Sequence, residues 1–459
     1  MIDKLALPEV RELLDADDRA TLGEVLNEWL PADLAGLLDG LTDGEKVRVL
    51  HTLRGPLAAE VFEYLELVTQ ERLLELLSEP EAAVLLEAMA PDDRTALLEE
   101  LPAARAERLL ALLSPGERSV AESLLGYSPD SVGRLMTPDY VAVRKDWTIK
   151  HVLDHVRTHG KDSETLNVIY VVDDEHRLTA ELRVRFLLLA PLHQHVRDHA
   201  NETFLALKTV EDKKAAVEVF RKYDRTVLPV IDGRGTLVGI VTIDDVLDLA
   251  DEEATRAIQK FGGLEALDLP YVSTPLLSMV RKRSSWLVVL FLGELLTASA
   301  MGHFEGEIAR LPVLALFLPL IISSGGNSGS QAATLIIRAL ALGEIRLGDY
   351  GKVFARELAS GLLLGLLLGS IGFLRITIWS QFSDIYTAHW PMVALVVGLA
   401  LVGVVLWGSL CGAMLPFLLK RLGFDPATSS APFVATLVDV TGIIIYFSVA
   451  YSLLRGRLL

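Results

Sequence analysis

Long apolar stretches recur from Trp286 onward, and charged residues retreat to the gaps between them. The hydrocarbon core of a bilayer is about 30 Å thick, and a helix needs about 20 residues to cross it. Five stretches approach or exceed that length, so we expect five transmembrane helices. They cover residues 285–304, 311–342, 353–379, 390–419 and 430–454.

Basic residues predict how these spans are oriented in the lipid bilayer. Arg281, Lys282 and Arg283 precede the first span, and more Lys and Arg residues follow the second and fourth spans. The positive-inside rule makes that side cytoplasmic. The first ten residues lack a basic start and a long apolar run, so we expect no signal peptide. A multi-pass protein of the inner (plasma) membrane with a large cytoplasmic N-terminal region follows.

Residues 1–130 have the pattern of short amphipathic helices that repeat about every 24 residues. Proline is common in the first turn of a helix because its missing N–H has no partner there in any case. A repeat of helical hairpins predicts a solenoid. The prolines that precede successive apolar runs are Pro31, Pro56, Pro80 and Pro102.

Residues 136–250 contain a second repeat. The segment Tyr170–Leu178 matches Pro229–Leu237 at an offset of 59 residues. Each copy alternates a helix with short strands rich in Val and Ile, which predicts two small α/β modules. With the ending Gly239–Val246, these copies resemble a tandem pair of cystathionine-β-synthase (CBS) regulatory modules.

The fold class is therefore multidomain. We expect an acidic α-helical superhelix over residues 1–130, an α/β tandem CBS pair over 131–250, a connecting helix over 251–283, and an α-helical membrane domain with five helices over 284–459.

Charge and composition exclude several functions. The net charge is -18, and residues 1–130 hold 28 acidic and 11 basic residues, a balance of -17. This argues against a nucleic-acid partner, because such proteins neutralise phosphates with basic surfaces. One cysteine, Cys411, excludes a disulfide scaffold. The chain has no phosphate-binding P-loop for active pumping, and its spans lack a zinc-protease motif or a plausible Ser/His/Asp set, so we expect no enzyme.

The second span contains the polar, glycine-rich stretch Ser323–Gln331. One interpretation is an interruption of the helix that frees backbone carbonyls, and such backbone must face protein or water. The other is close helix packing, which Gly and Ser also serve. Asn327 and Gln331 favour a polar path, and both interpretations stay open from composition.

Asp439 lies near the middle of the otherwise uncharged fifth span. Ionisable residues at that depth are functional by default, although a protonated Asp can also join two helices by a hydrogen bond. One carboxylate cannot surround a bare Mg²⁺, which takes six oxygens. Two copies of Asp439 across a two-fold axis could instead hold a hydrated ion. Glu294, in the middle of the first span, is either a second ion contact or a helix-to-helix hydrogen bond.

Several motifs resemble the MgtE family of magnesium transporters. They are Gly325-Gly326-Asn327 with Gly329 and Gln331, then Ala333–Ala339, Ala413–Leu419 and Asp439–Gly442. The resemblance covers essentially the whole chain, including the order of its domains.

The resemblance implies a homodimer that moves Mg²⁺ into the cytoplasm down its electrochemical gradient, with no obligatory protein partner. It places the ion at Asp439 and at the Ala435 carbonyl, with Asp425 at the cytoplasmic mouth. Ser330 stands where close relatives often have Asn. The residues that would line the path are Gly325, Gly326, Asn327, Ser330, Gln331 and Thr334.

The resemblance also implies gating by cytosolic Mg²⁺, which would bridge acids of the connecting helix to acids of the N-terminal domain. Arg256 and Ala257 occupy positions where the family commonly has two further acids, which predicts weaker or redistributed inhibition. The matching regulatory acids are Asp245, Asp248, Glu252 and Glu253.

An adenine nucleotide is a possible ligand of the CBS pair. Such pairs often bind it through a Thr and an Asp, and Thr242 with Asp245 retain that pattern. The first module has Arg183 and Phe186 at the equivalent positions and Glu181 in its strand, so we expect at most one intact half-site. A purely structural role for the pair is the alternative.

Histidines suggest the main rival function. His151, His155 and His159 have i, i+4 spacing, so one helix face would present all three. They are either surface residues or a sensor of Zn²⁺, Co²⁺ or Ni²⁺. The rivals to Mg²⁺ transport are therefore transport of Co²⁺ or another divalent metal with histidine sensing, and a membrane sensor of metal or nucleotide that transports nothing.

Overall fold

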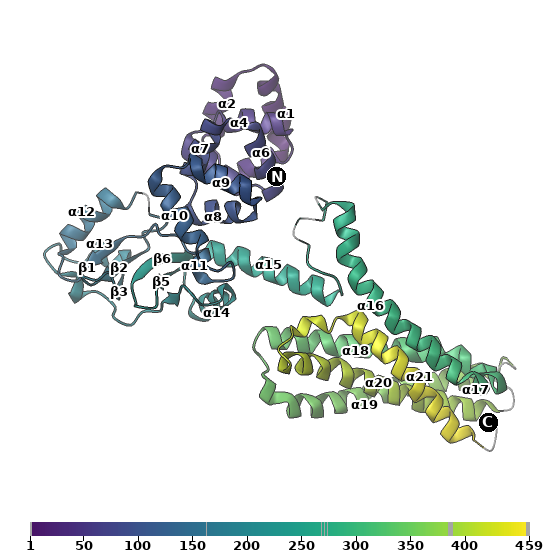
Figure 1. Cartoon of the computed structure of the whole chain (residues 1–459). Coiled ribbons are helices and arrows are strands. Elements are labelled where there is room, and N and C mark those ends of the chain that lie inside the picture. The colour runs from purple at the N-terminus through teal and green to yellow at the C-terminus, as the bar shows by residue number, and fades with distance from the viewer. Residues whose placement is uncertain are drawn as a thin grey trace. The chain divides into compact units, whose positions relative to one another are not determined.

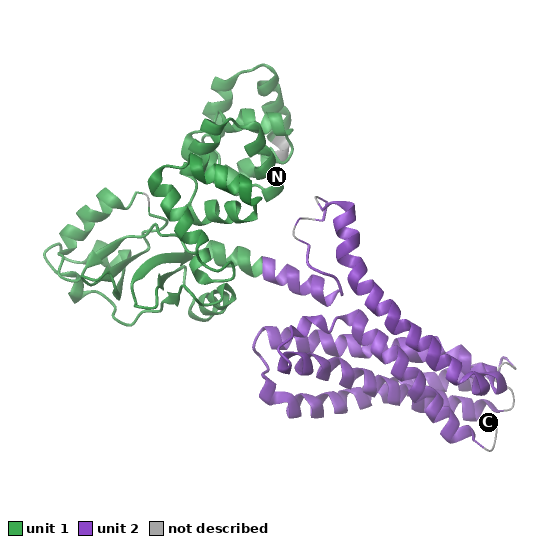
Figure 2. Cartoon of the chain, in the orientation of Figure 1, with its two compact units in different colours: residues 1–251 green, residues 252–459 purple. Residues whose placement is uncertain are grey.

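The computed structural model describes residues 2–161, 163–267, 269, 271–272, 274–383 and 389–455. The chain divides into two compact units, residues 1–251 and 252–459 (Figure 2). We call them the soluble unit and the membrane unit.

The soluble unit begins with ten helices that form the predicted solenoid (Figure 1). From α3 to α10 they alternate in two series, and within each series the helices begin 24 residues apart. The helices are α1 (Ile2–Asp15), α2 (Arg19–Leu26), α3 (Pro31–Leu38), α4 (Asp43–Leu50), α5 (Gly55–Glu63), α6 (Leu67–Leu76), α7 (Glu79–Ala88), α8 (Pro91–Glu100), α9 (Ala103–Leu112) and α10 (Pro115–Leu125).

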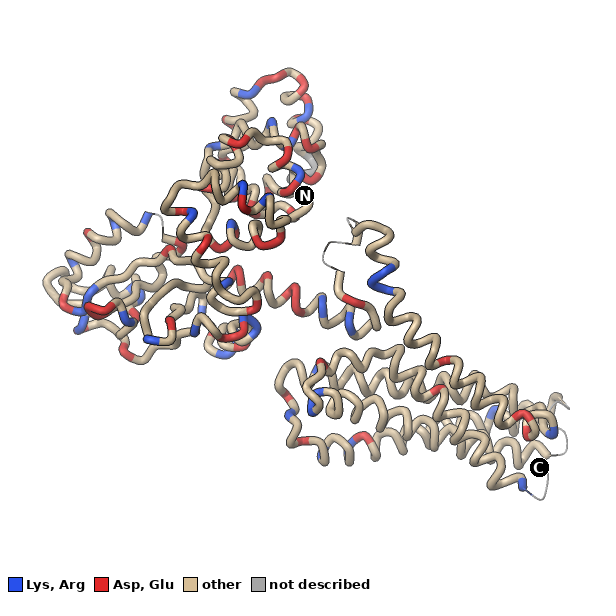
Figure 3. The backbone as a smooth tube through the Cα atoms, viewed as in Figure 1, with Lys and Arg blue, Asp and Glu red and all other residues tan. Residues whose placement is uncertain are grey.

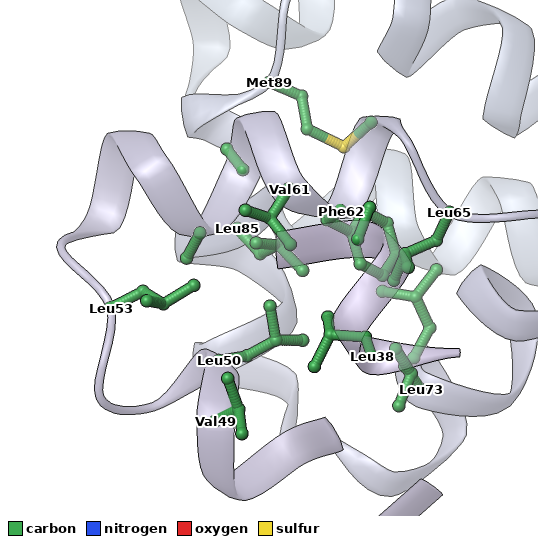
Figure 4. Packing of buried hydrophobic residues seen from close by; sticks show 14 of the residues in the cluster. Leu38, Val49, Leu50, Leu53, Val61, Phe62, Leu65, Leu73, Leu85 and Met89 are labelled. Carbon is green, nitrogen blue, oxygen red and sulfur yellow. The ribbon is translucent and has the colours of Figure 1, made fainter. Parts of the chain in front are cut away.

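Apolar side chains of successive helices build one continuous core along the solenoid. Leu38, Phe62 and Leu73 are fully buried in it, and Figure 4 shows them converging with residues of neighbouring helices. A single helical hairpin could not bury its own apolar face, so successive repeats stack and cover one another.

The rest of the soluble unit is the predicted pair of α/β modules. Each has a three-stranded sheet in which the first two strands are parallel and the last two antiparallel. The offset of 59 residues is confirmed, since it relates β2 to β5 and β3 to β6. The elements are α11 (Val132–Leu135), β1 (Ala142–Arg144), α12 (Ile149–His159), β2 (Val168–Val172), β3 (Leu178–Arg183), α13 (Val184–Leu189), η1 (Val196–Asp198), β4 (Leu207–Lys208), α14 (Lys213–Tyr223), β5 (Val227–Ile231) and β6 (Leu237–Thr242).

The connecting segment differs from the expected single helix over 251–283. Helix α15 (Ile243–Phe261) begins inside the second module and ends well before the membrane helices. Gly263, with a φ of +74°, follows that end, and a left-handed residue there stops a helix. Helix α16 (Leu276–His303) then begins nine residues before the first predicted span.

Among the described residues, five helices are long and apolar enough to cross a membrane, as predicted. Figure 3 shows that charged positions in this unit gather near the helix ends. The elements are α16, α17 (Glu305–Arg310), η2 (Pro312–Phe317), α18 (Leu318–Ala341), η3 (Leu347–Asp349), α19 (Tyr350–Trp379), α20 (Trp390–Arg421), η5 (Pro426–Thr428) and α21 (Ala431–Leu454).

Of the two interpretations of Ser323–Gln331, the interruption of the second span is wrong, because α18 is continuous there. Its small residues serve packing instead. A Cβ added to Gly412 would overlap the carbonyl oxygen of Gly329, and one added to Gly329 would lie 2.9 Å from the carbonyl oxygen of Gly408. Helices α18 and α20 therefore meet backbone to backbone, as small residues allow in membranes.

Candidate ion path and acidic cavity

One face of α18 carries a row of polar side chains. Ser323, Asn327, Gln331 and Thr334 recur at intervals of three or four residues, and all four are exposed in the single chain. Their hydrogen bonds are local: Asn327 Nδ2 donates to Ser323 Oγ over 3.4 Å, and the Thr334 hydroxyl donates to the Ser330 carbonyl over 2.8 Å. Lipid cannot satisfy the remaining donors and acceptors.

Asp439 borders this face from α21. A Cβ added to Gly326 would lie 3.5 Å from the Ala435 Cβ and 3.7 Å from Asp439 Oδ1. Asp439 is half-buried, and it makes no hydrogen bond or ion pair with any described residue. Helix α18 thus leaves room for a carboxylate that has no counter-charge among the described residues of its own chain.

Other residues expected in the lining fall in different places. Gly325 is buried against Val404 and Val438, so we correct it to a packing residue. Ser330 is half-buried, and its hydroxyl donates to the Ala431 carbonyl over 3.3 Å. Ala435 lies inside continuous α21, where a carbonyl accepts the N–H four residues later and keeps one lone pair free.

Asp425 lies at the start of η5, next to the N-terminus of α21. Its Oδ1 accepts from the Ala427 N–H over 2.9 Å, and its Oδ2 forms an ion pair with Lys260 Nζ at 2.8 Å. Lys260 is at the end of α15. The predicted cytoplasmic mouth is therefore tied to the connecting helix by one ion pair.

The soluble unit contains an acidic cavity of about 990 Å³. Two helix N-termini bring acids to it: Asp93 from α8, and Asp244, Asp245 and Asp248 from α15. A helix N-terminus is a favourable place for negative charge. The other acids of the lining are Glu60, Glu63, Glu87, Glu117, Asp139 and Glu164.

Crowding and burial disfavour ionisation of these acids. Burial raises the pKa of Asp93 to about 6, with Asp244 and Asp248 adding to the effect. Burial likewise raises the pKa of Glu63 and of Asp245 to about 7. A divalent ion would relieve both causes, since it supplies the missing positive charge.

Asp92 lies next to this lining and is 9% exposed. Burial raises its pKa well above the ordinary value, and the charge of Asp245 adds to the shift. Among the described residues, its Oδ1 has no hydrogen-bond partner. However, no three described His, Cys, Asp or Glu side chains lie close enough to hold a bare ion. Ions here would bind through water.

The other two predicted regulatory acids share one basic partner. Glu252 and Glu253 both form ion pairs with Arg256, the second at 3.5 Å. Arg256 thus partly compensates the charge of both acids.

The predicted nucleotide residues lie together, since the Thr242 hydroxyl donates to Asp245 Oδ2 over 2.7 Å. Asp245 therefore belongs both to that pair and to the acidic cavity. In the first module the buried Glu181 forms an ion pair with Arg225 at 3.1 Å, so its strand holds a protein ion pair.

The three histidines lie along α12 as predicted. The rings of His155 and His159 stack with centroids 4.4 Å apart, and Trp147 covers the edges of His151 and His155. Burial lowers the pKa of His155, as do its two histidine neighbours. Stacked rings do not aim their nitrogens at one point, so this geometry does not support a three-histidine metal site.

Comparison with known proteins decides the family. The profile of the MgtE family, described as divalent cation transporters, matches residues 318–449, and those of the MgtE intracellular N domain and the CBS domain match 29–130 and 132–180 with 196–252. The magnesium transporter MgtE of Thermus thermophilus is 41% identical over 99% of this chain and 100% of its own length. The chain belongs to the MgtE family.

Other MgtE proteins agree. The magnesium transporter MgtE of Enterococcus faecalis is 30% identical over 73% of this chain and 71% of its own. A solved structure of the cytosolic domain of the Mg²⁺ channel MgtE in complex with ATP is 38% identical, with a TM-score of 0.51 over 53% of this chain and 99% of that chain. MgtE is a family of membrane transporters, which confirms the expected membrane protein and the expectation of no enzyme.

Sequence reasoning missed the solenoid's share of the acidic cavity in this MgtE protein. It invoked the N-terminal acids as a group but did not single out Asp92, Asp93 or Glu63. One signal was available, because Asp92 and Asp93 follow Pro91 at a helix start. Glu164 and Asp244 reach the cavity only through the folding of the CBS pair.

Proposed function

We propose that the protein carries Mg²⁺ into the cytoplasm down its electrochemical gradient, along a path between α18 and α21. The names of its relatives support the ion, since three of them are called magnesium transporter MgtE. The membrane potential supplies the driving force, about 4.6 kcal/mol for a divalent ion at 100 mV.

The observation that carries the proposal is the polar row of α18 beside the unpaired Asp439. Four polar side chains and a carboxylate cannot face lipid without a large cost. They can face water and a second copy of the chain. We therefore propose a homodimer in which the lining residues are Gly326, Asn327, Ser330, Gln331 and Thr334, with Gly325 behind them.

Asp439 is the proposed ion site. Mg²⁺ loses its water reluctantly and is commonly bound through one or two carboxylates. Two copies of Asp439 would supply them, with Ala435 offering its remaining carbonyl lone pair. Among the described residues, no group of His or Cys side chains that could hold a metal ion lies at this carboxylate, and nitrogen and sulfur ligands are what Zn²⁺ and Co²⁺ prefer.

Gating would use the acidic cavity and the connecting helix. At high internal Mg²⁺, hydrated ions bridge α8 to the start of α15, at Asp245 and Asp248, and fix the helix that carries Lys260. The Lys260–Asp425 ion pair then holds the cytoplasmic mouth shut. Glu252 and Glu253 contribute less than Asp245 and Asp248, because Arg256 already pairs with both of them.

An adenine nucleotide is a second proposed ligand of the soluble unit. A relative's cytosolic domain has been solved with ATP, which favours the same class of ligand here. Thr242 and Asp245 would hold its ribose. Because Asp245 also lines the acidic cavity, nucleotide and Mg²⁺ would influence each other's binding.

The test is Mg²⁺ flux into dye-loaded liposomes under an inside-negative potential, with internal Mg²⁺ near zero. Wild type should conduct, and Asp439→Ala should lose the flux or its preference for Mg²⁺ over Co²⁺ and Zn²⁺. Asp349→Asn is the control, because Asp349 is an acid of the membrane unit that is paired at 3.0 Å with Lys352 at the end of a span. A folded wild type that conducts nothing would favour the sensor. Equal flux in wild type and Asp439→Ala would move the ion site elsewhere.

A further inference from the structure

Glu294 has no role in the path described so far. It lies on α16, eight residues after Trp286, which is about 12 Å along the helix axis. Trp286 marks the start of the span, so Glu294 is near mid-membrane. The side chain is exposed, and it makes no hydrogen bond or ion pair with any described residue. A carboxylate at that depth needs polar surroundings.

The packing of α16 brings Glu294 to the neighbourhood of Asp439. A Cβ added to Gly293 would lie 2.8 Å from the Thr436 side chain, and Trp286 Nε1 donates to Ser430 Oγ over 3.0 Å. These contacts fix α16 along α21, and Thr436 is one helical turn before Asp439. Glu294 adjoins Gly293, and Asp439 follows Thr436 by one turn, so the two acids lie at the same level of two packed helices.

A second polar group at the same place also lacks a partner. Thr297 is three residues beyond Glu294, hence on the same side of α16, and it is 7% exposed. Among the described residues, its Oγ1 has no hydrogen-bond partner, not even a backbone carbonyl one turn back. A buried hydroxyl without a partner is rare in proteins and indicates a water or ligand that completes it.

We propose that Glu294 is the second carboxylate of the ion site, and that it holds a hydrated divalent cation together with Asp439 while Thr297 contacts the ion's water. This inference rests on the proposed function and adds α16 to the path. Two neighbouring carboxylates in a medium of low dielectric repel each other unless a positive charge lies between them. A hydrated divalent cation meets that need.

Two substitutions of Glu294 distinguish a role for its charge from a purely structural role. Glu294→Gln keeps the shape and the hydrogen bonding but removes the charge. Glu294→Asp keeps the charge and shortens the side chain. If Glu294 merely joins two helices, Gln should serve and Asp should fail. If it binds the cation, Asp should serve better than Gln.

The experiment measures the Mg²⁺ concentration dependence of flux in liposomes, with the full-length chain and a folding check by thermal melting. Glu294→Gln should raise the KM for Mg²⁺ about tenfold, the usual effect of losing one charged contact. Glu294→Asp should stay within about threefold of wild type, and Thr297→Val should fall between the two. Ser299→Ala is the matched control on α16, since the Ser299 hydroxyl bonds only to the Leu295 carbonyl.

These measurements separate failure of the Glu294 proposal from failure of the proposed Mg²⁺ transport. If wild type conducts and Asp439→Ala does not, but Glu294→Gln keeps the wild-type KM, the inference is overturned and the proposed function stands. The same holds if Glu294→Asp is worse than Glu294→Gln. If wild type itself conducts nothing, the proposed function fails first.

Discussion

Carboxylates are scarce in the membrane unit and crowded in the soluble unit. Helices α16 and α21 carry one acid each, Glu294 and Asp439, and α18 carries none. The acidic cavity, by contrast, collects ten acids from the solenoid, the CBS pair and the start of α15. In the membrane a single charge is costly, so an acid there is rare and usually functional. Around a polar cavity of the soluble unit, several acids can share one task.

The two units also build their cores differently. The solenoid buries leucines and Phe62 in a continuous core (Figure 4). The membrane unit brings backbones together at Gly325, Gly329, Gly408 and Gly412, because lipid offers helices no hydrophobic drive to associate. A membrane core of this kind tolerates a change of size less well than a leucine core.

The largest effect is expected from enlarging a glycine at the contact between α18 and α20. Gly412→Ala places a methyl group on the Gly329 carbonyl oxygen, so α18 and α20 must separate. We expect a loss of about 3 kcal/mol or more in unfolding free energy, seen as a lower melting temperature in detergent. Gly351→Ala is the control, since nothing lies within 4 Å of its new Cβ. Equal melting of the two variants would contradict backbone packing.

A second prediction tests whether Glu252 and Glu253 on α15 can take part in binding the regulatory Mg²⁺. Arg256→Glu removes the charge that pairs with Glu252 and Glu253 and adds a third acid beside them. Inhibition of flux by internal Mg²⁺ should then occur at about fivefold lower concentration, a scale set by exposed ion pairs near 1 kcal/mol. Arg256→Gln should give a smaller shift. An unchanged inhibition curve in Arg256→Glu would show that these acids do not bind the regulatory ion.

The third prediction concerns pH. The cavity acids have a raised pKa in the folded state, about 6 for Asp93 and about 7 for Asp245, against 3.8 when unfolded. Between about pH 4 and pH 7 the folded state therefore binds more protons than the unfolded state. The free energy of unfolding falls as pH rises through that window. We expect a loss on the order of 2 kcal/mol, measured by hydrogen exchange of α8 and the start of α15 in the full chain.

Mg²⁺ supplies the check on that prediction. Added Mg²⁺ should restore protection at pH 7 and do little at pH 4.5, where the acids are protonated. Asp93→Asn should reduce the pH dependence without abolishing it, because other acids remain. If protection from hydrogen exchange rises with pH in the absence of Mg²⁺, burial and crowding do not raise the pKa of the cavity acids.

Periodic features were predictable from sequence, and features that depend on tertiary contact were not. The 24-residue repeat, the 59-residue offset and the five spans all follow from local patterns, and all are confirmed. The Ser323–Gln331 stretch was ambiguous because glycine serves both an open backbone and close packing. The Gly408 and Gly412 contacts that resolve it come from residues about 80 positions away.

The candidate site shows the same limit. Asp439 was identifiable because one acid in an apolar span is conspicuous. The cavity around Asp93 was not, since acids are common in the N-terminal region and only the fold selects those that meet Asp244 and Asp245. Thr297 gave no sequence signal at all, as its lack of a partner is a property of the packed helices.

The smallest effect is expected at the three histidines of α12, a side-chain cluster whose geometry does not favour a metal ion. His155 and His159 stack on each other rather than converge on a point, and the pKa of His155 is lowered by burial and by its neighbours. Replacing His151, His155 and His159 together by Gln should change Mg²⁺ flux by less than about twofold at pH 7.5, because these residues lie on α12 and none of them belongs to the proposed path. The same variant should leave inhibition by Zn²⁺ unaltered. A loss of Zn²⁺ sensitivity with normal Mg²⁺ flux would instead assign metal sensing to this face of α12. The chain would then bind metal ions at clustered histidines as well as at the membrane carboxylates and the acidic cavity.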